Sequence, residues 1–474
     1  MRTRFPAPTR HAVRLAALLG VALTMNLAPA RAADDVKALL ELLMEKGLIT
    51  QAEYDAKIRK AQEMEEIRAF NEAQDVRRAN REIDKRAEEE RKFKTQIYGQ
   101  LSAGWYQASN MTSANKDADG MADQPKGNNR IGLRVTRELD ADNTAVVTLE
   151  SNFSARTGAI GANSGAFGSN ATTTSNNVGL LGSVFDREAN VRWISKTYGT
   201  FILGRGPNLQ NDLSGAFDAR QNWNFGGLKP IGRYAGFHSA SGVNRADRMF
   251  RYISPVIEGF NVDGGMSWGG APEDGEKGSS YYLGGRYRNG NFEMGYNHIE
   301  AKIGDSFTTP ASEVNNRVDF LAAKYTLDKL TLNAGYAISK NPTNSYSFNT
   351  GKANGRVNAN TFFTGAVYRF TPAFSWNVGY YDVSDQSPTG SRTNGLSMFA
   401  TGLTWSPYKD WDFFADYAAV RRLSGATGAF TIYDRWVPDT STARNCVPTT
   451  PTAAGCSDST ANQSGFSVGA QFKF

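Results

Sequence analysis

Few side chains in the sequence have the chemistry of a catalytic or metal centre. The chain has three histidines: His238 and His298 are isolated, and His11 lies near the start. No combination of serine, histidine and acid and no histidine-rich spacing typical of a metal site is visible. Asn297-His298 followed by Glu300 is only a faint version of the histidine site of a lipid hydrolase. The sequence therefore predicts no enzyme, no metal site and no cofactor.

The charge balance depends strongly on the first 32 residues. The whole chain has 53 Lys plus Arg, 47 Asp plus Glu and a formal charge of +6. Residues 1–32 contain five basic and no acidic residues, a mostly apolar stretch at 15–27 and the small-x-small sequence Ala30-Arg31-Ala32, which together are typical of a secretory signal cleaved after Ala32. A retained anchor helix is the alternative, but the apolar stretch is short for a membrane span. Removing the signal leaves 48 basic and 47 acidic residues, so a nucleic-acid partner is not expected.

Export also affects the interpretation of the two cysteines. Cys446 and Cys456 lie close together in a long polar segment near the end of the chain. In an exported protein a disulfide between them is the expected state. The sequence has no CxxC or CxxCH motif, which argues against a redox or covalent haem role.

The composition excludes two broad classes of protein. Beyond the signal, no stretch approaches the roughly 20 apolar residues that each span of a polytopic helical membrane protein needs. Disorder throughout is excluded by the 27 Phe, 19 Tyr and 8 Trp, which are far more than a chain without a buried core would carry. The 47 glycines and abundant aromatic residues favour one large β-barrel over several soluble domains.

Residues 33–94 have the composition of helices. They contain 16 acidic and 14 basic side chains, no proline and a single glycine, Gly47. A short apolar helix is expected to end at Gly47, and Thr50 with Glu53 forms a capping box that opens a second, long helix. The phrase LLMEKGLITQAEYDAKI resembles a helix-turn-helix segment of bacterial envelope proteins that is interpreted as an oligomerisation element.

The long helix has only a sparse apolar side. Its apolar residues fit a heptad seam loosely, and they are Ile67, Phe70, Ala73, Val76, Ile83 and Ala87. One interpretation is a single solvated helix with ion pairs between residues four apart. The other is a trimeric coiled coil, in which partner helices would supply the missing burial.

From residue 95 onward the pattern changes to a period of two. In the segment 129–138, Ile131, Leu133 and Val135 share one face, while the other face is polar. The final segment, GFSVGAQFKF, alternates in the same way. Such alternation, with segments of about ten residues, is typical of an outer-membrane barrel whose apolar face meets lipid and whose polar face lines the lumen.

Counting these segments predicts sixteen antiparallel strands, an even number as single-chain barrels require. The expected strands are 95–107, 129–138, 143–154, 185–196, 199–205, 246–254, 258–268, 280–288, 291–300, 317–326, 330–339, 360–370, 373–384, 395–406, 411–421 and 463–474. Very short connections alternate with long loops rich in Gly, Asn, Ser and Thr. Since short turns belong on the periplasmic side, both chain ends and the helical segment are expected in the periplasm.

The sequence also resembles a known family. The phrases NNRIGLRVTRELDADNTAVVTLESNF, FDREANVRWISKTYGTFILGRGPNL, NRADRMFRYISPVIEGF and GFSVGAQFKF are similar, in order and spacing, to the general porins of Gram-negative bacteria. The similarity extends over residues 95–474. It implies a trimer of sixteen-stranded barrels in the outer membrane, with a third external loop folded into the lumen. The helical segment 33–94 is a departure from ordinary members.

The lumen residues follow from the alternation together with this resemblance. The long connection between Arg205 and Arg245 occupies the place of the constricting loop, and its carboxylates are Asp212 and Asp218. The strand residues expected to face it are Arg130, Arg134, Arg192 and Arg251, with Glu150 on the third strand. Arg205 matches a family position that points into the pore, although its alternation with Phe201 and Leu203 places it outside unless Gly204 or Gly206 allows a bulge.

These residues predict a water-filled channel for passive diffusion of small hydrophilic solutes and ions. Basic side chains facing two loop aspartates create a transverse field, which predicts a mild preference for anions. The alternative is a structural role, in which the barrel anchors a trimeric helical stalk that extends toward peptidoglycan. The expected partners are two further copies of the chain, outer-membrane lipid including lipopolysaccharide, and the solutes.

Overall fold

The computed structural model contains two compact units. The described residues are 37–38, 40–47, 49–91, 93–111, 115–156, 158, 160, 184–238, 245–268, 279–304, 313–340, 358–386, 392–422, 430, 432–433 and 461–474. One unit ends at Arg91 and the other begins at the next residue. The signal region and both cysteines, Cys446 and Cys456, lie outside the described residues.

The first unit contains a helical stretch at residues 40–45 followed by the long helix α3, Gln51–Arg91. Gly47 has a φ of +69°, a left-handed conformation that glycine adopts without steric cost. At the start of α3, the Thr50 amide donates to Glu53 Oε2 at 2.9 Å, and the Glu53 amide donates to Thr50 Oγ1 at 3.3 Å. The predicted turn and capping box are therefore confirmed.

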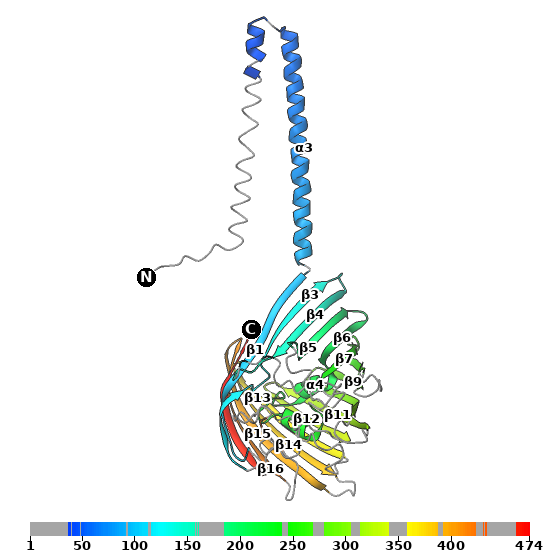
Figure 1. The fold of residues 1–474 in the computed structure, drawn as a ribbon, viewed down its shortest axis with the longest axis vertical. Coiled ribbons are helices and arrows are strands. Elements are labelled where there is room, and N and C mark those ends of the chain that lie inside the picture. The colour runs from blue at the N-terminus through cyan, green and yellow to red at the C-terminus, as the bar shows by residue number, and fades with distance from the viewer. Residues whose placement is uncertain are drawn as a thin grey trace, which may run out of the picture. The chain divides into compact units, whose positions relative to one another are not determined.

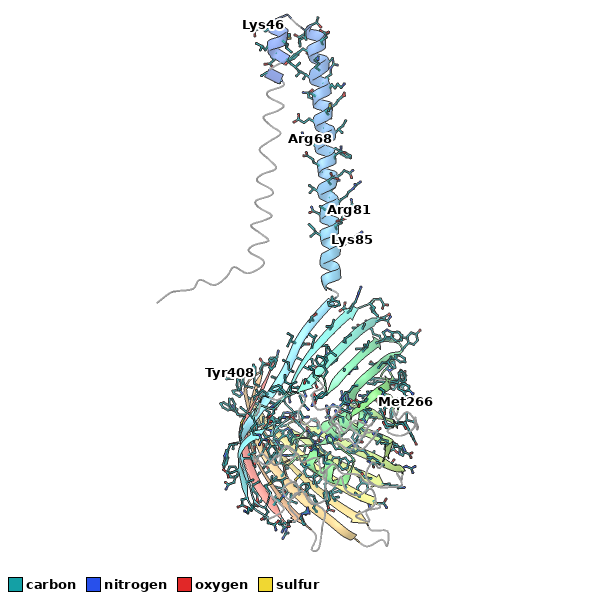
Figure 2. The ribbon with its side chains drawn as sticks, viewed as in Figure 1. Lys46, Arg68, Arg81, Lys85, Met266 and Tyr408 are labelled. Atoms are coloured by element: carbon teal, nitrogen blue, oxygen red, sulfur yellow. The ribbon has the colours of Figure 1, made fainter. Side chains whose placement is uncertain are left out.

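Helix α3 is polar on most of its surface. Arg68 pairs with Glu72 one turn away at 3.2 Å, and Figure 2 shows Arg68, Arg81 and Lys85 projecting from the helix. Among the described helices, none combines the length and apolar character that crossing a bilayer demands.

The second unit is a closed antiparallel β-barrel (Figure 1). Its strands are β1 Phe93–Ala108, β2 Ala118–Asp123, β3 Arg130–Glu138, β4 Asn143–Asn152, β5 Glu188–Ser195, β6 Gly199–Pro207, β7 Arg245–Ile253, β8 Phe260–Ser267, β9 Ser280–Asn289, β10 Phe292–Gly304, β11 Glu313–Leu327, β12 Leu330–Lys340, β13 Asn358–Thr371, β14 Phe374–Gln386, β15 Arg392–Tyr408, β16 Trp411–Arg422 and β17 Gln463–Lys473. Each strand from β3 to β17 pairs with the next, and β17 pairs with β1 to close the circuit.

The short strand β2 was not predicted, yet the predicted count of sixteen is confirmed. One edge of β1 pairs with β3 over Phe93–Gln100 and with β2 over Ala103–Ala108. Strands β2 and β3 therefore occupy one position in the circuit. In the described residues, seventeen strands fill sixteen positions.

The alternation sorts side chains between the two faces as predicted. Ile131 is 44% exposed on the outer face of β3, and Val468 is 42% exposed on that of β17. Aromatic side chains such as Trp411 and Phe472, whose ring centroids are 4.9 Å apart, gather where the short turns connect the strands. Met266 and Tyr408 also point outward, at 43% and 70% exposure (Figure 2).

The inner face is not uniformly polar, which corrects the expectation of a polar lining. Apolar inward residues on β10–β16 are buried, and they include Ile299, Val318, Phe320, Phe363, Tyr381, Val383, Leu396 and Met398. They pack against residues 208–238, which connect β6 to β7 and are called the inward loop here. The loop removes this part of the wall from water, so apolar side chains are favoured there.

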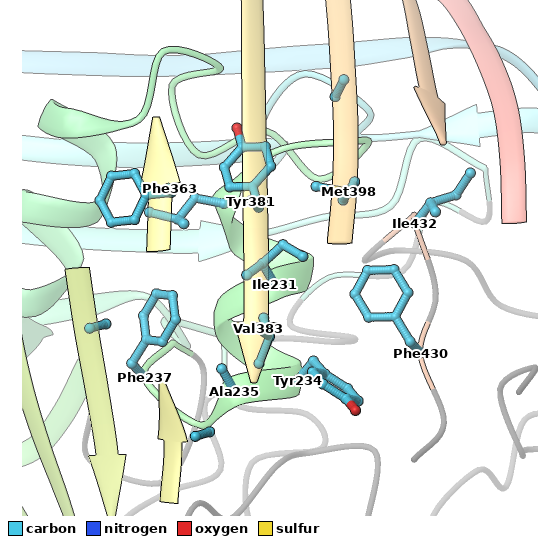
Figure 3. Packing of buried hydrophobic residues seen from close by; sticks show 14 of the residues in the cluster. Ile231, Tyr234, Ala235, Phe237, Phe363, Tyr381, Val383, Met398, Phe430 and Ile432 are labelled. Atoms are coloured by element: carbon cyan, nitrogen blue, oxygen red, sulfur yellow. The ribbon is translucent and has the colours of Figure 1, made fainter. Parts of the chain in front are cut away.

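Two helices give the inward loop its shape. Helix α4, Leu209–Phe217, is capped by Asn208, whose side chain accepts a hydrogen bond from the Asn211 amide at 3.2 Å. Helix α5, Leu228–Ala235, is buried along its whole length and contacts β13 and β14. Figure 3 shows Ile231, Tyr234 and Phe237 of this loop packed beside side chains from the barrel wall.

Candidate functional site

Inward-facing arginines line the wall formed by β3, β4 and β5. Arg130 and Arg134 alternate with the outward Ile131, and Arg192 alternates with the outward Val191. The guanidinium of Arg134 lies 4.8 Å from the ring centroid of Tyr98 on β1. Three of the predicted arginines therefore share one side of the lumen.

Glu150 on β4 connects two of the arginines on this wall. Its side chain is 5% exposed and lies 3.6 Å from Arg130 and 2.5 Å from Arg187. Arg192 pairs with Glu188, four residues before it on β5. Arg187 was missed because alternation within the expected strand 185–196 places it on the face opposite Arg192. In the structure β5 begins only at Glu188, and Arg187 lies before it.

Arg205 is the exception to alternation along its strand. The register between β6 and β7 shifts between Gly204 and Gly206, and Gly204 has a φ of +122°. This bulge buries Arg205, whose Nε donates to the Asp186 carbonyl at 2.7 Å and whose Nη1 pairs with Asp247. Arg205 is therefore held inside the wall by a local backbone irregularity.

Arg251 on β7 fastens the inward loop to the wall. Its Nη2 lies 2.6 Å from Asp212 on α4 and 2.5 Å from Asp263 on β8. Tyr282 on β9 donates to Asp263 at 3.3 Å. The structure thus brings two of the residues named from the sequence, Arg251 and Asp212, together in an ionic contact.

Asp218 lies within the inward loop, and the structure does not place it beside the strand arginines. Its carboxylate accepts hydrogen bonds from the Tyr381 hydroxyl at 2.6 Å and from the amides of Leu228, Arg220 and Asn222 at 2.9, 3.1 and 2.8 Å. Burial raises the pKa of the Asp218 carboxyl, and these hydrogen bonds act in the opposite direction. The group organises the turn between α4 and α5.

Arg220 anchors that turn to the opposite wall. Its side chain is fully buried, with Nη2 2.9 Å from Asp416 on β16 and Nη1 donating to Asn377 on β14. Its guanidinium lies 4.5 Å from the ring centroid of Trp223. The sequence places Arg220 in the loop but gives no sign of its distant partners.

Residues of the last long connection also reach the loop. Phe225 forms a β-bridge with Tyr433, and the Gly226 amide donates to the Ile432 carbonyl at 3.0 Å. Phe430, Ile432 and Tyr433 are each no more than 1% exposed (Figure 3). The inward loop is therefore held by charged groups at β7, β8 and β16 and by a second inward segment.

The faint hydrolase pattern does not form a nucleophilic site. His298 Nδ1 lies 2.7 Å from Asp319 Oδ1, but no Ser or Thr hydroxyl of the described residues is hydrogen-bonded to this ring. Within the same residues, no group of three or more His, Cys, Asp or Glu side chains is arranged to hold a metal ion.

The geometry is that of a barrel with a loop folded into its lumen, and the sequence comparison agrees with it. Residues 73–425 match the sequence profile described as Gram-negative porin. The chain belongs to this family. A Gram-negative porin is an outer-membrane channel, not an enzyme. No curated protein matches the sequence.

Solved structures share the fold of this porin. An anion-selective porin from Comamonas acidovorans has a TM-score of 0.60 at 16% identity, covering 81% of this chain and 100% of that one. OmpF of Salmonella typhi in complex with daunomycin has a TM-score of 0.51 at 14% identity, covering 81% and 98%. The trimer form of OmpT, an outer membrane protein of Vibrio cholerae, has a TM-score of 0.50 at 13% identity, covering 81% and 99%.

Proposed function

We propose that this porin conducts small hydrophilic solutes and ions by passive diffusion, with a mild preference for anions. The observation that carries the proposal is the unequal exposure of opposite charges on the wall of β3–β5. The side chains of Arg130 and Arg192 are 35% and 25% exposed, whereas those of Glu150 and Glu188 are 5% and 14% exposed. A solute that passes this wall meets more guanidinium than carboxylate surface, which favours anions.

The constriction itself is assigned to the inward loop and the charged wall that faces it. Arg130, Arg134 and Arg192 supply the basic side, and Asp212 is 31% exposed on α4. Arg251, Glu150, Arg205 and Asp218 are almost entirely buried. We assign these four to holding the shape of the constriction, since buried and paired groups contact a passing solute least.

Planar-bilayer recordings across a salt gradient test the ion preference. The reversal potential of the wild-type channel should favour the anion, and Arg134→Glu with Arg192→Glu should shift it toward the cation. The matched control is Lys196→Glu, because Lys196 lies in the β5–β6 turn with its side chain 74% exposed. A wild-type reversal potential that favours cations would overturn the proposed preference, and a purified protein without conductance would overturn the channel.

The same proposal includes a homotrimer with both chain ends in the periplasm. Its support is the set of very short connections at one end of the strands, such as Asn289 to Phe292 and Leu327 to Leu330, because short turns are periplasmic in such barrels. The trimer form of OmpT has the same fold. A cysteine introduced at Gly290 should not react with a membrane-impermeant thiol reagent in intact cells. Labelling of this cysteine would indicate the opposite orientation of the barrel.

A second function, a periplasmic tether, is favoured by one specific observation on α3. Five apolar side chains of this helix are 58–64% exposed, and they are Met64, Ile67, Phe70, Val76 and Ile83. Copies of α3 in a trimeric coiled coil would cover them. The 41 residues would span about 62 Å at 1.5 Å per residue, a length suited to reaching toward peptidoglycan.

Deleting residues 34–91 separates the two roles of this segment. If the shortened protein still forms a trimer with unchanged conductance while the cell envelope is loosened, the result would support the tether. Loss of the trimer would support an oligomerisation role instead. If the deletion changes neither the envelope nor the trimer, both proposed roles of the segment would be excluded.

A further inference from the structure

The ring of Tyr98 lies across a glycine on the lumenal side of the barrel wall. Tyr98 of β1 is opposite Gly132 of β3, and it alternates with Ile97, which is 68% exposed on the outer face. A Cβ added at Gly132 would lie 2.4 Å from Tyr98 Cζ and 2.7 Å from the Tyr98 hydroxyl oxygen. The ring therefore occupies the space that a side chain at position 132 would fill, and it packs directly on β3.

Arg134 lies over this ring and has no carboxylate beside it. Its guanidinium carbon is 4.8 Å from the centroid of the Tyr98 ring, within the range of a cation–π contact. Among the described residues, no Asp or Glu forms an ion pair with Arg134, whereas Arg130 and Arg192 on the same wall each pair with a glutamate. The guanidinium is thus held by stacking alone, so its N–H groups and its second face are available to a solute.

The wall between Arg134 and Arg192 contains hydrogen-bond donors without acceptors. Thr148 of β4 is opposite Arg134 on one side and opposite Asn190 of β5 on the other. Thr148 is 0% exposed, and its hydroxyl oxygen has no hydrogen-bond partner among the described residues. Arg192 donates through Nε to Asn190 at 2.9 Å and through Nη2 to Glu188, and its Nη1 has no acceptor in the described part of the chain. A negatively charged group on a solute would supply the missing acceptor.

These groups lie at a different height from the upper arginines of the wall. Arg134 is four residues beyond Arg130 along β3, toward the short turn that leads to β4. At about 3.3 Å per residue and a tilt of about 40°, the two positions are separated by about 10 Å along the barrel axis. Arg130 and Arg187 share the buried carboxylate of Glu150. The upper arginines are therefore already paired, whereas the lower group is not.

We propose that Arg134 and Arg192, with Tyr98, form a subsite for planar aromatic carboxylates that pass through the channel. The carboxylate binds to Arg192, above the Thr148 hydroxyl, through charge-assisted hydrogen bonds. The aromatic ring lies on the second face of the Arg134 guanidinium, which extends the stack that begins with Tyr98. A saturated ring offers no such face, so the subsite distinguishes solutes of equal charge. This inference rests on the proposed channel and adds a solute class to it.

The test compares the block of chloride current by benzoate and by cyclohexanecarboxylate, which have the same charge and similar size, in planar-bilayer recordings of the full-length protein. Benzoate should half-block the wild-type channel at a concentration about two- to fivefold lower than cyclohexanecarboxylate, which is the factor expected from one cation–π contact. Arg134→Lys keeps the charge but loses the planar face, so it should remove the difference. The matched control is Arg288→Lys, the same change at a side chain that is 68% exposed near the end of β9.

The outcomes separate this subsite from the proposed ion preference. Equal block by the two acids in the wild type, no block by either, or a difference that persists in Arg134→Lys or disappears in Arg288→Lys would overturn the subsite. If Arg134→Lys does not fold, Tyr98→Leu removes the ring beneath the guanidinium and provides the same comparison. A wild-type reversal potential that favours cations, in a channel that still distinguishes the two acids, would overturn the anion preference alone. An anion-favouring channel that does not distinguish them would overturn the subsite alone.

Discussion

Replacing Arg220 by methionine should detach the inward loop from the far wall of the barrel. The guanidinium is fully buried, 2.9 Å from Asp416, hydrogen-bonded to Asn377 and stacked at 4.5 Å on Trp223. Methionine keeps most of the volume but removes every polar contact. The carboxylate of Asp416, which is 1% exposed, then loses the guanidinium that pairs with it.

The size of the effect follows from that unpaired carboxylate. Removing one partner of a buried ion pair costs about 3–5 kcal/mol, because the remaining charge stays in an apolar environment. Removing both partners with Arg220→Met and Asp416→Leu avoids this cost and should recover most of the lost stability. The control is Arg288→Met, since the Arg288 side chain is 68% exposed and its pair with Glu293 should contribute only about 0–1 kcal/mol.

Two measurements check the reasoning. Urea unfolding of the protein folded into lipid vesicles gives the change in the free energy of unfolding. Single-channel recordings should show a larger and noisier conductance for Arg220→Met, because the loop is released at one end. A destabilisation below about 1 kcal/mol, or a double variant as unstable as Arg220→Met, would refute the idea that the buried pair anchors the loop.

Three further changes have definite expected outcomes. Gly204→Ala should lower the free energy of unfolding in urea by about 1–3 kcal/mol or more, because a positive φ is strained in alanine and the added Cβ would lie 2.3 Å from a carbonyl oxygen of β5. Tyr381→Phe removes the hydroxyl that donates to Asp218 and should cost about 1.5–3 kcal/mol in the same assay. Hydrogen bonds from Thr50 hold the pKa of Glu53 below its usual value, so the amides at the start of α3 should be fully protected from hydrogen exchange above the ordinary glutamate pKa. Their protection factors, which compare the observed with the intrinsic exchange rate at each pH, should fall as the pH drops through the lowered pKa, and Glu53→Gln should lose this dependence.

The barrel was predictable from sequence because its physical cause is local. Each strand crosses the same two environments, so the period of two repeats in every segment, and turns interrupt it at regular intervals. The capping box of Thr50 and Glu53 was predictable for the same reason, since it involves residues three apart. The bulge at Gly204 could be stated only as a condition, because glycine permits the shift in register without requiring it.

The residues that escaped prediction depend on contacts far along the chain. Strand β2 has the sequence ADGMAD, which has no clear alternation, and it forms because β1 extends beyond the end of β3. Asp218 and Arg220 are polar residues in a polar loop, and nothing near them in sequence indicates that Tyr381 and Asp416 complete their environment. The role of each is set by folding the loop into the barrel.

The division of the lumen into two kinds of wall limits where solutes can pass. Along β10–β16 many inward side chains are apolar and are covered by the inward loop, so this part of the wall offers little polar surface to water and ions. Along β3–β5 the arginines keep part of their surface exposed, as Arg130 does at 35%. We therefore expect conduction to follow the arginine wall. Substitutions there should alter ion preference, while substitutions at the anchors of the loop should alter conductance first.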